Sequence, residues 1–124
     1  MLPAEALVPP GAIAAFMSPM GIQFSTQGTV ARISLKVHGI ACTVDLGIVD
    51  NIVSVNSLTA KVIFGIPLPY LRGLVVKEIA AHLDEAKIDY TIQGNSLVLA
   101  GTQFGVKVSV VCLGSDGMIR ASVG

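Results

Sequence analysis

The stretch "VARISLKVHGIACTVDLG", residues 30–47, decides the fold because its two halves mirror each other about His38-Gly39. If this dipeptide is a two-residue turn, every second pair of facing residues is apolar on both strands. The pairs between them are polar or small, and one of them sets Arg32 opposite Asp45. A helix would not produce this symmetry, so the stretch predicts an antiparallel hairpin with one core face.

Further turns extend this hairpin on both sides. A turn at Gln27-Gly28 sets Phe24 opposite Ala31, again on the apolar face. A turn at Asp50-Asn51 continues the same alternation downstream, and one extra residue near Asn56-Ser57 would explain a later change of apolar parity. The sequence therefore predicts a four-stranded meander that contains a β-bulge.

A helical pattern follows the meander. After Pro67 and Pro69, the sequence "YLRGLVVKEIAAHLDEAKI" of residues 70–88 repeats its apolar residues at i, i+4 spacing. We expect this helix to cover a sheet with one apolar stripe. The stripe consists of Leu71, Val75, Ile79, Leu83 and Ala86.

From Ile88 onward the alternation typical of strands returns. The expected turns are Gln93-Gly94, Phe104-Gly105 and Asp116-Gly117. The first of them sets Tyr90 opposite Leu97, and the last, a strong type I′ signal, sets Cys112 opposite Ala121. This region predicts a second four-stranded meander.

The two halves of the chain align without gaps. Gln27-Gly28 recurs 66 residues later as Gln93-Gly94, and "IAAFM" at 13–17 recurs as "IAAHL" at 79–83. We interpret the chain as one domain, residues 1–124, built from two helix-plus-four-strand units at about 10–64 and 70–124, although units of this size can also coincide by chance. The first helix is the shorter copy and begins at Pro10.

The predicted fold class is α+β. Two meanders can join into one curved antiparallel sheet with both helices on its apolar face, or curl into a partial barrel. Either arrangement leaves apolar surface that two modest helices do not cover. We expect an apolar groove there, lined by Val75, Ile79, Leu83, Ile33, Leu35 and Val44.

The composition agrees with an uncovered apolar surface. Hydrophobic residues make up 52% of the 124 residues and charged residues 13%, against roughly 45–50% and about 25% in ordinary globular chains. Such a surface indicates a ligand, a lipid or a second subunit, and a homo-oligomer is the simplest case. The formal net charge of +0 disfavours nucleic acid as a partner.

The chain is expected to be cytoplasmic. Its N-terminal residues 1–17 have no positive n-region and contain Glu5 and three prolines, which is unlike a signal peptide. No apolar run reaches the 18 or so residues of a transmembrane span. Cys42 and Cys112 have no ligand-spaced partner, so we expect buried free thiols.

No catalytic, metal or cofactor motif is found in the sequence, and we expect the protein not to be an enzyme. Glu78 and His82 have the i, i+4 spacing of a helix-surface pair, and a reaction would require a third polar group beside them. His38 fits a tight turn, and with Arg32 and Lys36 it forms a small basic row on the outer strand face. No phosphate-binding glycine motif is present.

Two stretches carry a resemblance to a known family. The order "VDNIVSVNSLTAKVIFGIPLPYLRGLVVKEIAAHL" (49–83), followed by "IDYTIQGNSLVLAG" (88–101), resembles the tubular lipid-binding (TULIP) superfamily and its small bacterial members. The resemblance implies an apolar cleft between a helix and a curled sheet that accepts acyl chains. The element order also resembles a sliding-clamp domain, but the helices here lack the basic residues that face DNA in clamps.

Two functions therefore remain open after the sequence. The first is a non-enzymatic binding module for a lipid-like ligand. The second is a structural or assembly protein whose apolar surface is a subunit interface.

Overall fold

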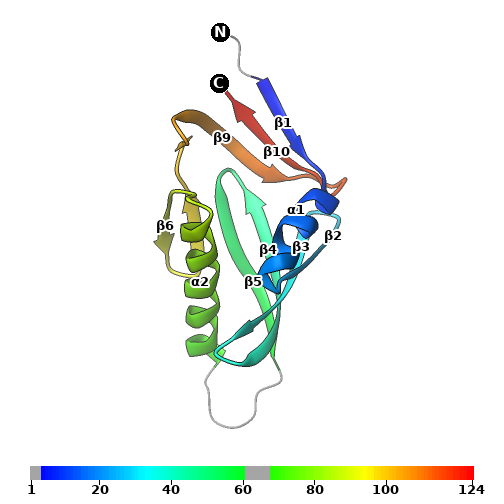
Figure 1. The fold of residues 1–124 in the computed structure, drawn as a ribbon, viewed down its shortest axis with the longest axis vertical. Helices are drawn as coiled ribbons and strands as arrows, with labels where there is room; N and C mark the ends of the chain where they lie inside the picture. The colour runs from blue at the N-terminus through cyan, green and yellow to red at the C-terminus, as the bar shows by residue number, and fades with distance from the viewer. Residues whose placement is uncertain (1–3, 61–67) are drawn as a thin grey trace.

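The computed structural model describes residues 4–60 and 68–124. In these residues the fold is α+β, as predicted, with two antiparallel sheets and two α-helices (Figure 1). The elements are β1 Ala4–Val8, α1 Pro10–Met17, a 3-10 turn Ser18–Met20, β2 Gln23–Gln27, β3 Val30–Val37, β4 Ile40–Val49, β5 Ile52–Ala60, α2 Leu68–Glu85, β6 Tyr90–Gln93, β7 Ser96–Leu99, β8 Thr102–Gln103, β9 Val106–Leu113 and β10 Ile119–Val123.

The larger sheet has the strand order β2-β3-β4-β5-β7-β6. Its centre is the predicted hairpin, and all seven predicted pairs are confirmed, from Val37 opposite Ile40 to Ala31 opposite Leu46. His38 and Gly39 have φ values of 51° and 80°, which a type I′ turn requires at both central residues. The alternation alone was enough to determine this register.

The next hairpin and its bulge are also confirmed. Asp50 and Asn51 form the turn between β4 and β5 with φ values of 50° and 66°. Pairing then shifts between Asp45 and Leu46, which leaves Asn56 as the extra residue. Across from the bulge, a Cβ at Gly47 would lie 2.9 Å from Asn56 Nδ2, so this position has no room for a side chain.

Two predicted registers are wrong by two residues. The turns are Gly28-Thr29 and Gly94-Asn95, so Phe24 faces Ile33 rather than Ala31, and Tyr90 faces Leu99 rather than Leu97. Each glycine occupies the first turn position, with φ of 59° at Gly28 and 60° at Gly94, as a type II′ turn requires. The core face is unchanged because a shift of two residues keeps each side chain on its side.

The predicted second meander is split between the sheets. The β6-β7 hairpin pairs with β5 in the larger sheet, whereas β8, β9 and β10 form a smaller sheet of order β1-β10-β9-β8. The break falls at Ala100-Gly101, between β7 and β8. Two sheets therefore replace the predicted single curved sheet or partial barrel, and two equal four-stranded units are not reproduced.

The last hairpin also differs from its prediction. Cys112 faces Arg120 rather than Ala121, because the loop runs from Gly114 to Met118 instead of being a two-residue turn. The Asp116 side chain accepts a hydrogen bond from the backbone N–H of Met118 at 3.1 Å, which favours this wider loop. A second irregularity leaves Val110 as an extra residue in β9.

Helix α2 covers one face of the larger sheet (Figure 1). Leu71 and Val75 of the predicted stripe are completely buried, but Val76 and Ala80 are the next most buried residues, ahead of Ile79 and Leu83. Ala86 is half-buried. Toward the C-terminal end of α2, the buried stripe is therefore displaced by about one residue from the predicted stripe. Pro69 lies in its first turn, where a proline is tolerated.

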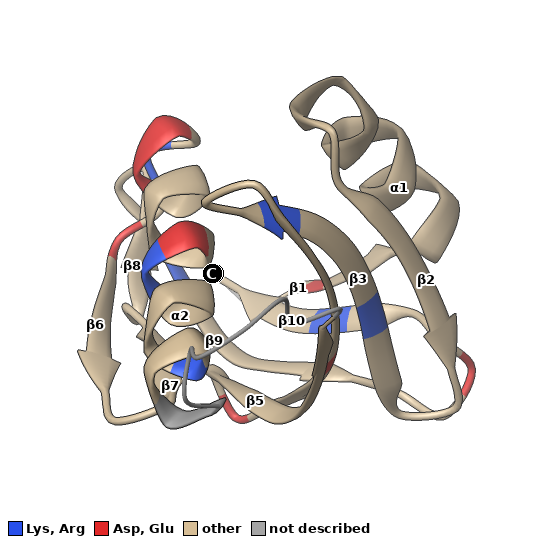
Figure 2. Ribbon diagram, turned by 90° about the horizontal axis from the view of Figure 1, so that it is seen from below, with Lys and Arg blue, Asp and Glu red and all other residues tan. Residues whose placement is uncertain are grey.

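Helix α1 begins at Pro10 as predicted but covers little of the apolar face. It packs against β2 (Figures 1 and 2), has no buried residue, and contacts the core cluster through its last residue, Met17. Eight residues offer too little apolar surface to cover a sheet. The prediction of two helices that cover one face is therefore not confirmed.

Both cysteines are free thiols, as expected. Cys42 is buried and Cys112 is half-buried. Within residues 4–60 and 68–124, neither helix combines the length and apolarity needed to cross a membrane. The last residues of the predicted first unit, 61–64, and Pro67 before the helix lie outside the described residues.

Candidate functional site

The six residues predicted to line a groove come together under α2, but as packed core. Ile33, Leu35, Val44 and Val75 are at most 5% exposed. Ile79 and Leu83 are half-buried and pack against the same cluster. The described surface is hollowed beside this cluster, where Leu35 also contributes to the lining, and again at the β8-β9 hairpin.

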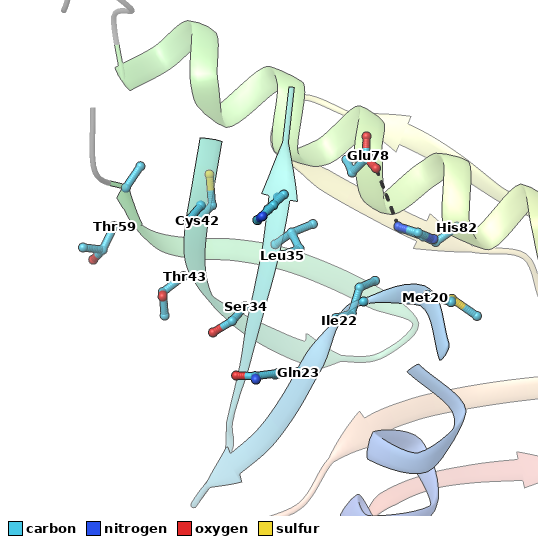
Figure 3. Close-up of a pocket in the computed structure, with 14 residues that line it drawn as sticks. Met20, Ile22, Gln23, Ser34, Leu35, Cys42, Thr43, Thr59, Glu78 and His82 are labelled. Carbon is cyan, nitrogen blue, oxygen red and sulfur yellow. Dashed lines mark ion pairs between the residues drawn. The ribbon is translucent and has the colours of Figure 1, made fainter. Parts of the chain in front are cut away.

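The larger hollow, about 850 Å³, lies between α2 and the ends of β2–β5 (Figure 3). It brings Glu78 and His82 close to Leu35 and Cys42. Glu78 Oε1 lies 3.6 Å from His82 Nε2, and His82 Nδ1 lies 3.9 Å from Glu85 Oε2. This is the helix-surface pair that the sequence predicted, with a second carboxylate one turn further along.

The other polar groups of this hollow do not complete a catalytic arrangement. Leu35 and Cys42 are buried toward α2, whereas Ser34 and Thr43 follow in the alternate positions and point to the opposite face of the sheet. Burial raises the pKa of the Cys42 thiol, which keeps the sulfur protonated and weakly nucleophilic. The described residues contain no group of three or more His, Cys, Asp or Glu side chains that could hold a metal ion.

The second hollow is an apolar groove of about 380 Å³ between the end of β7 and the β8-β9 hairpin. Seven of its eight lining residues are apolar, and its rim is open, with Phe104 72% and Val106 43% exposed. The lining consists of Ile88, Leu99, Ala100, Gln103, Phe104, Val106, Val108 and Val111. None of these residues belongs to the groove predicted from the sequence.

One polar side chain lines the groove, and its amide is fully engaged. Gln103 Oε1 accepts a hydrogen bond from the backbone N–H of Asp89, and Gln103 Nε2 donates to the Asp89 carbonyl, both at 2.8 Å. Nε2 also donates to the carbonyl of Ala100 at 3.2 Å. Gln103 thus ties β8 to the segment before β6, and the groove offers a ligand no free polar group from this residue.

Asn51 holds the opposite wall. Its side-chain Oδ1 accepts from the backbone N–H of Val111 at 2.7 Å, and its Nδ2 donates to the Val108 carbonyl at 3.4 Å. Its backbone N–H donates to the Val111 carbonyl at 3.0 Å, and its carbonyl accepts from the Leu99 N–H at 2.8 Å. Both the side chain and the backbone of Asn51 therefore join the β4-β5 turn to β7 and β9, and the groove is held open before any ligand arrives.

The smaller sheet extends this apolar surface. On the strand pairs β1-β10 and β10-β9, the face that includes Val106 and Val108 carries only apolar side chains, and at the β8-β9 pair it also carries Gln103, which lies opposite Val106. Leu113 is buried and Ile119 packs against the core, but the rest of the face is half-buried or exposed. This face, which we call the small-sheet apolar face, consists of Ala4, Ala6, Val8, Val106, Val108, Leu113, Ile119, Ala121 and Val123.

The charged side chains that form ion pairs across the strands do not line the groove. Arg32 Nε lies 2.8 Å from Asp45 Oδ1 across β3 and β4, and this hydrogen bond holds the Asp45 pKa below its usual range. Arg120 pairs with both Glu5 and Asp116. Figure 2 shows the few charged residues scattered over several elements rather than gathered on one face.

Sequence reasoning missed the groove for an identifiable reason. Its walls come from β7 and β9, which do not pair with each other, and they are held together through Asn51 of a third strand pair. A signal was present in the alternating apolar residues Val106, Val108 and Val110, which follow the exposed Phe104. Comparisons with models of protein families, with curated proteins and with solved structures found no match for this chain.

Proposed function

We propose that the protein is a non-enzymatic binding module whose apolar groove takes a lipid-like or other hydrophobic ligand. The observation that carries this proposal is the groove between β7 and the β8-β9 hairpin, in which seven of eight lining residues are apolar. Its volume of about 380 Å³ falls within the roughly 300–1,000 Å³ of small-molecule sites. The two clamps at Asn51 and Gln103 support a preformed site.

The chemistry of the residues that line the groove favours an uncharged, apolar ligand. The hydrogen bonds of Gln103 and Asn51 are satisfied within the protein, so a polar ligand would lose hydration without gaining a partner. An acyl chain has no hydrogen bonds to water to lose on entry, and each buried methylene contributes about 0.8 kcal/mol. The resemblance to the TULIP superfamily also points to acyl chains. Both this resemblance and the cytoplasmic location stay predictions.

The groove proposal is tested by ligand uptake. We expect native mass spectrometry after mild extraction to detect a co-purifying apolar ligand, and a dansylated fatty acid to bind saturably. Ala100→Trp fills the groove from its wall and should weaken uptake about tenfold or more, since a displaced chain loses more than about 1.4 kcal/mol of burial. Val106→Lys, at an exposed rim position, should also weaken it without a folding defect.

A matched variant separates the two hollows. Ala60→Trp places the same ring in the larger hollow, because Ala60 pairs with Cys42 on the face of the sheet that α2 covers, and it should leave uptake unchanged. Loss of binding in Ala60→Trp but not in Ala100→Trp would move the site to the larger hollow. The absence of both a co-purifying ligand and fatty-acid uptake in the wild type would refute the proposal.

Assembly is the second candidate function, and one observation favours it. The small-sheet apolar face is only partly covered by the rest of the described chain, and Val8 and Val106 on it are 38% and 43% exposed. Uncovered apolar surface of this kind is typical of subunit interfaces. The assembly candidate does not depend on a ligand in the groove.

A further inference from the structure

Strand β1 presents an open edge of the smaller sheet. All five of its residues pair with β10, from Ala4 opposite Val123 to Val8 opposite Ile119, and no strand of the described residues pairs with its other side. Proteins usually protect such edges with lysine, proline or a bulge. The sequence AEALV of β1 contains none of these devices, and its one charged residue, Glu5, is already paired with Arg120 of the same sheet, so the edge is a template for another strand.

We propose that β1 pairs antiparallel with β1 of a second copy, about a two-fold axis at Ala6. The two smaller sheets would then form one eight-stranded sheet. This inference specifies the assembly candidate and is independent of the ligand proposal. It commits to a second copy because the strand is compatible with itself in charge and in register.

The register follows from the backbone and from one charge. In β1, the N–H and C=O groups that point away from β10 belong to every second residue, and only these groups can bond to a second strand. The residue that faces a given residue across the new strand pair can therefore shift only by two positions at a time. An axis at Glu5 would set two carboxylates directly opposite each other, which is destabilising. An axis at Leu7 would bring in Pro9, which has no N–H to donate. An axis at Ala6 pairs all five residues.

The pairing at Ala6 also suits the side chains. Ala4 faces Val8 of the second copy, which continues the small-sheet apolar face across the axis. Glu5 faces Leu7 of the second copy and keeps its ion pair with Arg120 Nη1, which lies 3.0 Å from Glu5 Oε1. No like charges meet across the new strand pair.

The edges of the larger sheet are weaker candidates. Helix α1 packs against β2, and β6 has four residues rather than five (Figures 1 and 2). The face of the larger sheet is also already covered by α2, so added strands there would not continue an open apolar surface. Strand β1 combines an open edge with such a face.

Opposite charges at position 7 test the pairing. Leu7 is 49% exposed and faces Arg120 within its own chain. In Leu7→Glu, the introduced carboxylate lies opposite Arg120 of its own chain, so the fold of the monomer is not weakened. In the dimer this carboxylate lies opposite Glu5 of the second copy, and the two-fold symmetry produces the repulsive pair twice. We expect the dimer dissociation constant of Leu7→Glu in analytical ultracentrifugation to rise roughly two- to thirty-fold, and that of Leu7→Lys to fall by a similar factor. Shifts in the same direction for both variants would overturn the proposal, as would a wild type that stays monomeric through the micromolar range.

Cross-linking tests the position of the axis. In Ala6→Cys the two new thiols face each other, within the range of a disulfide. In Ala4→Cys they lie about four residues apart along the strands, which is too far. We expect a disulfide dimer from Ala6→Cys and none from Ala4→Cys or from the wild type, whose Cys42 and Cys112 serve as the background. Cross-linking of Ala4→Cys in place of Ala6→Cys would refute this axis, and none of these variants changes a groove residue.

Discussion

At the scale of the residue, Val110 is held in a conformation that valine avoids. Its φ is 54°, in the left-handed region, because it is the extra residue of the bulge in β9. A β-branched side chain at positive φ is a true outlier and costs on the order of 1–3 kcal/mol. The side chain is 55% exposed, so little burial offsets this cost.

Replacing Val110 by glycine should therefore stabilise the protein. We expect Val110→Gly to raise the free energy of unfolding by about 1 kcal/mol, because the relief of strain exceeds the roughly 0.5–1 kcal/mol that glycine costs in a strand. Val106→Gly, in the same strand at ordinary φ, should lower it by about the same amount. Thermal unfolding of both variants is the measurement, and a loss of stability in Val110→Gly would contradict the strain.

The Arg32 and Asp45 pair predicts a dependence on pH. Arg32 and Ser57 both hydrogen-bond the Asp45 carboxylate and hold its pKa below the usual value. The pair therefore stabilises the fold above the unfolded-state pKa of about 3.9, and this contribution is lost as the pH falls through the lower folded-state pKa.

Asp45→Asn should reveal this pH dependence. At pH 7 we expect a melting temperature lower by a few degrees at most, since the Arg32 side chain is 56% and the Asp45 side chain 24% exposed and solvent screens the pair. The difference from the wild type should shrink toward zero as the pH is lowered below about 3.9. A difference that is constant with pH would show that the amide acts through packing rather than charge.

At the scale of the element, Asn51 joins the two sheets. The β4-β5 turn carries it at φ 66°, which asparagine tolerates, and its side chain then reaches Val108 and Val111 of β9. Along this edge of β9, hydrogen bonds to the turn residue Asn51 take the place of pairing with a neighbouring strand.

Asn51→Gly tests this connection while keeping the turn. Glycine accepts the positive φ, but the half-buried N–H of Val111 loses the Oδ1 acceptor. We expect a loss of about 1–3 kcal/mol in the free energy of unfolding and faster amide exchange at Val111. Asp50→Gly, at the other central position with φ 50° and an exposed side chain, should be nearly neutral. Equal effects of the two variants would mean that the turn, not the bridge, is being measured.

The hairpins show which strand registers the alternation of apolar residues can and cannot predict. The pairs about His38-Gly39 are correct because a type I′ turn and one apolar face leave a single register. The pairs at Gly28 and Gly94 are shifted because a glycine fits the first or the second turn position equally well. The larger Gly114–Met118 loop escaped prediction because it depends on a hydrogen bond from Met118 to the Asp116 side chain.

At the scale of the whole molecule, apolar surface dominates the chemistry. A composition with 13% charged residues leaves the small-sheet apolar face and the groove beside it incompletely covered. The two proposals divide this surface, with a hydrophobic ligand in the groove and a second copy at the edge of β1. Uptake and ultracentrifugation measure them separately, so the failure of one leaves the other standing.

By itself, the sequence determined the α+β class, the β2-β3-β4-β5 meander with its bulge, helix α2 and the excess of apolar surface. These depend on local alternation and turn chemistry, which act between residues that are neighbours in the chain or across one turn. Tertiary structure alone decided that β1 pairs with β10, that the strand pattern breaks at Ala100-Gly101, and that Asn51 bonds to β9 beside the groove. Those contacts join residues far apart in the chain, and their choice depends on which surfaces remain uncovered once the local elements have formed.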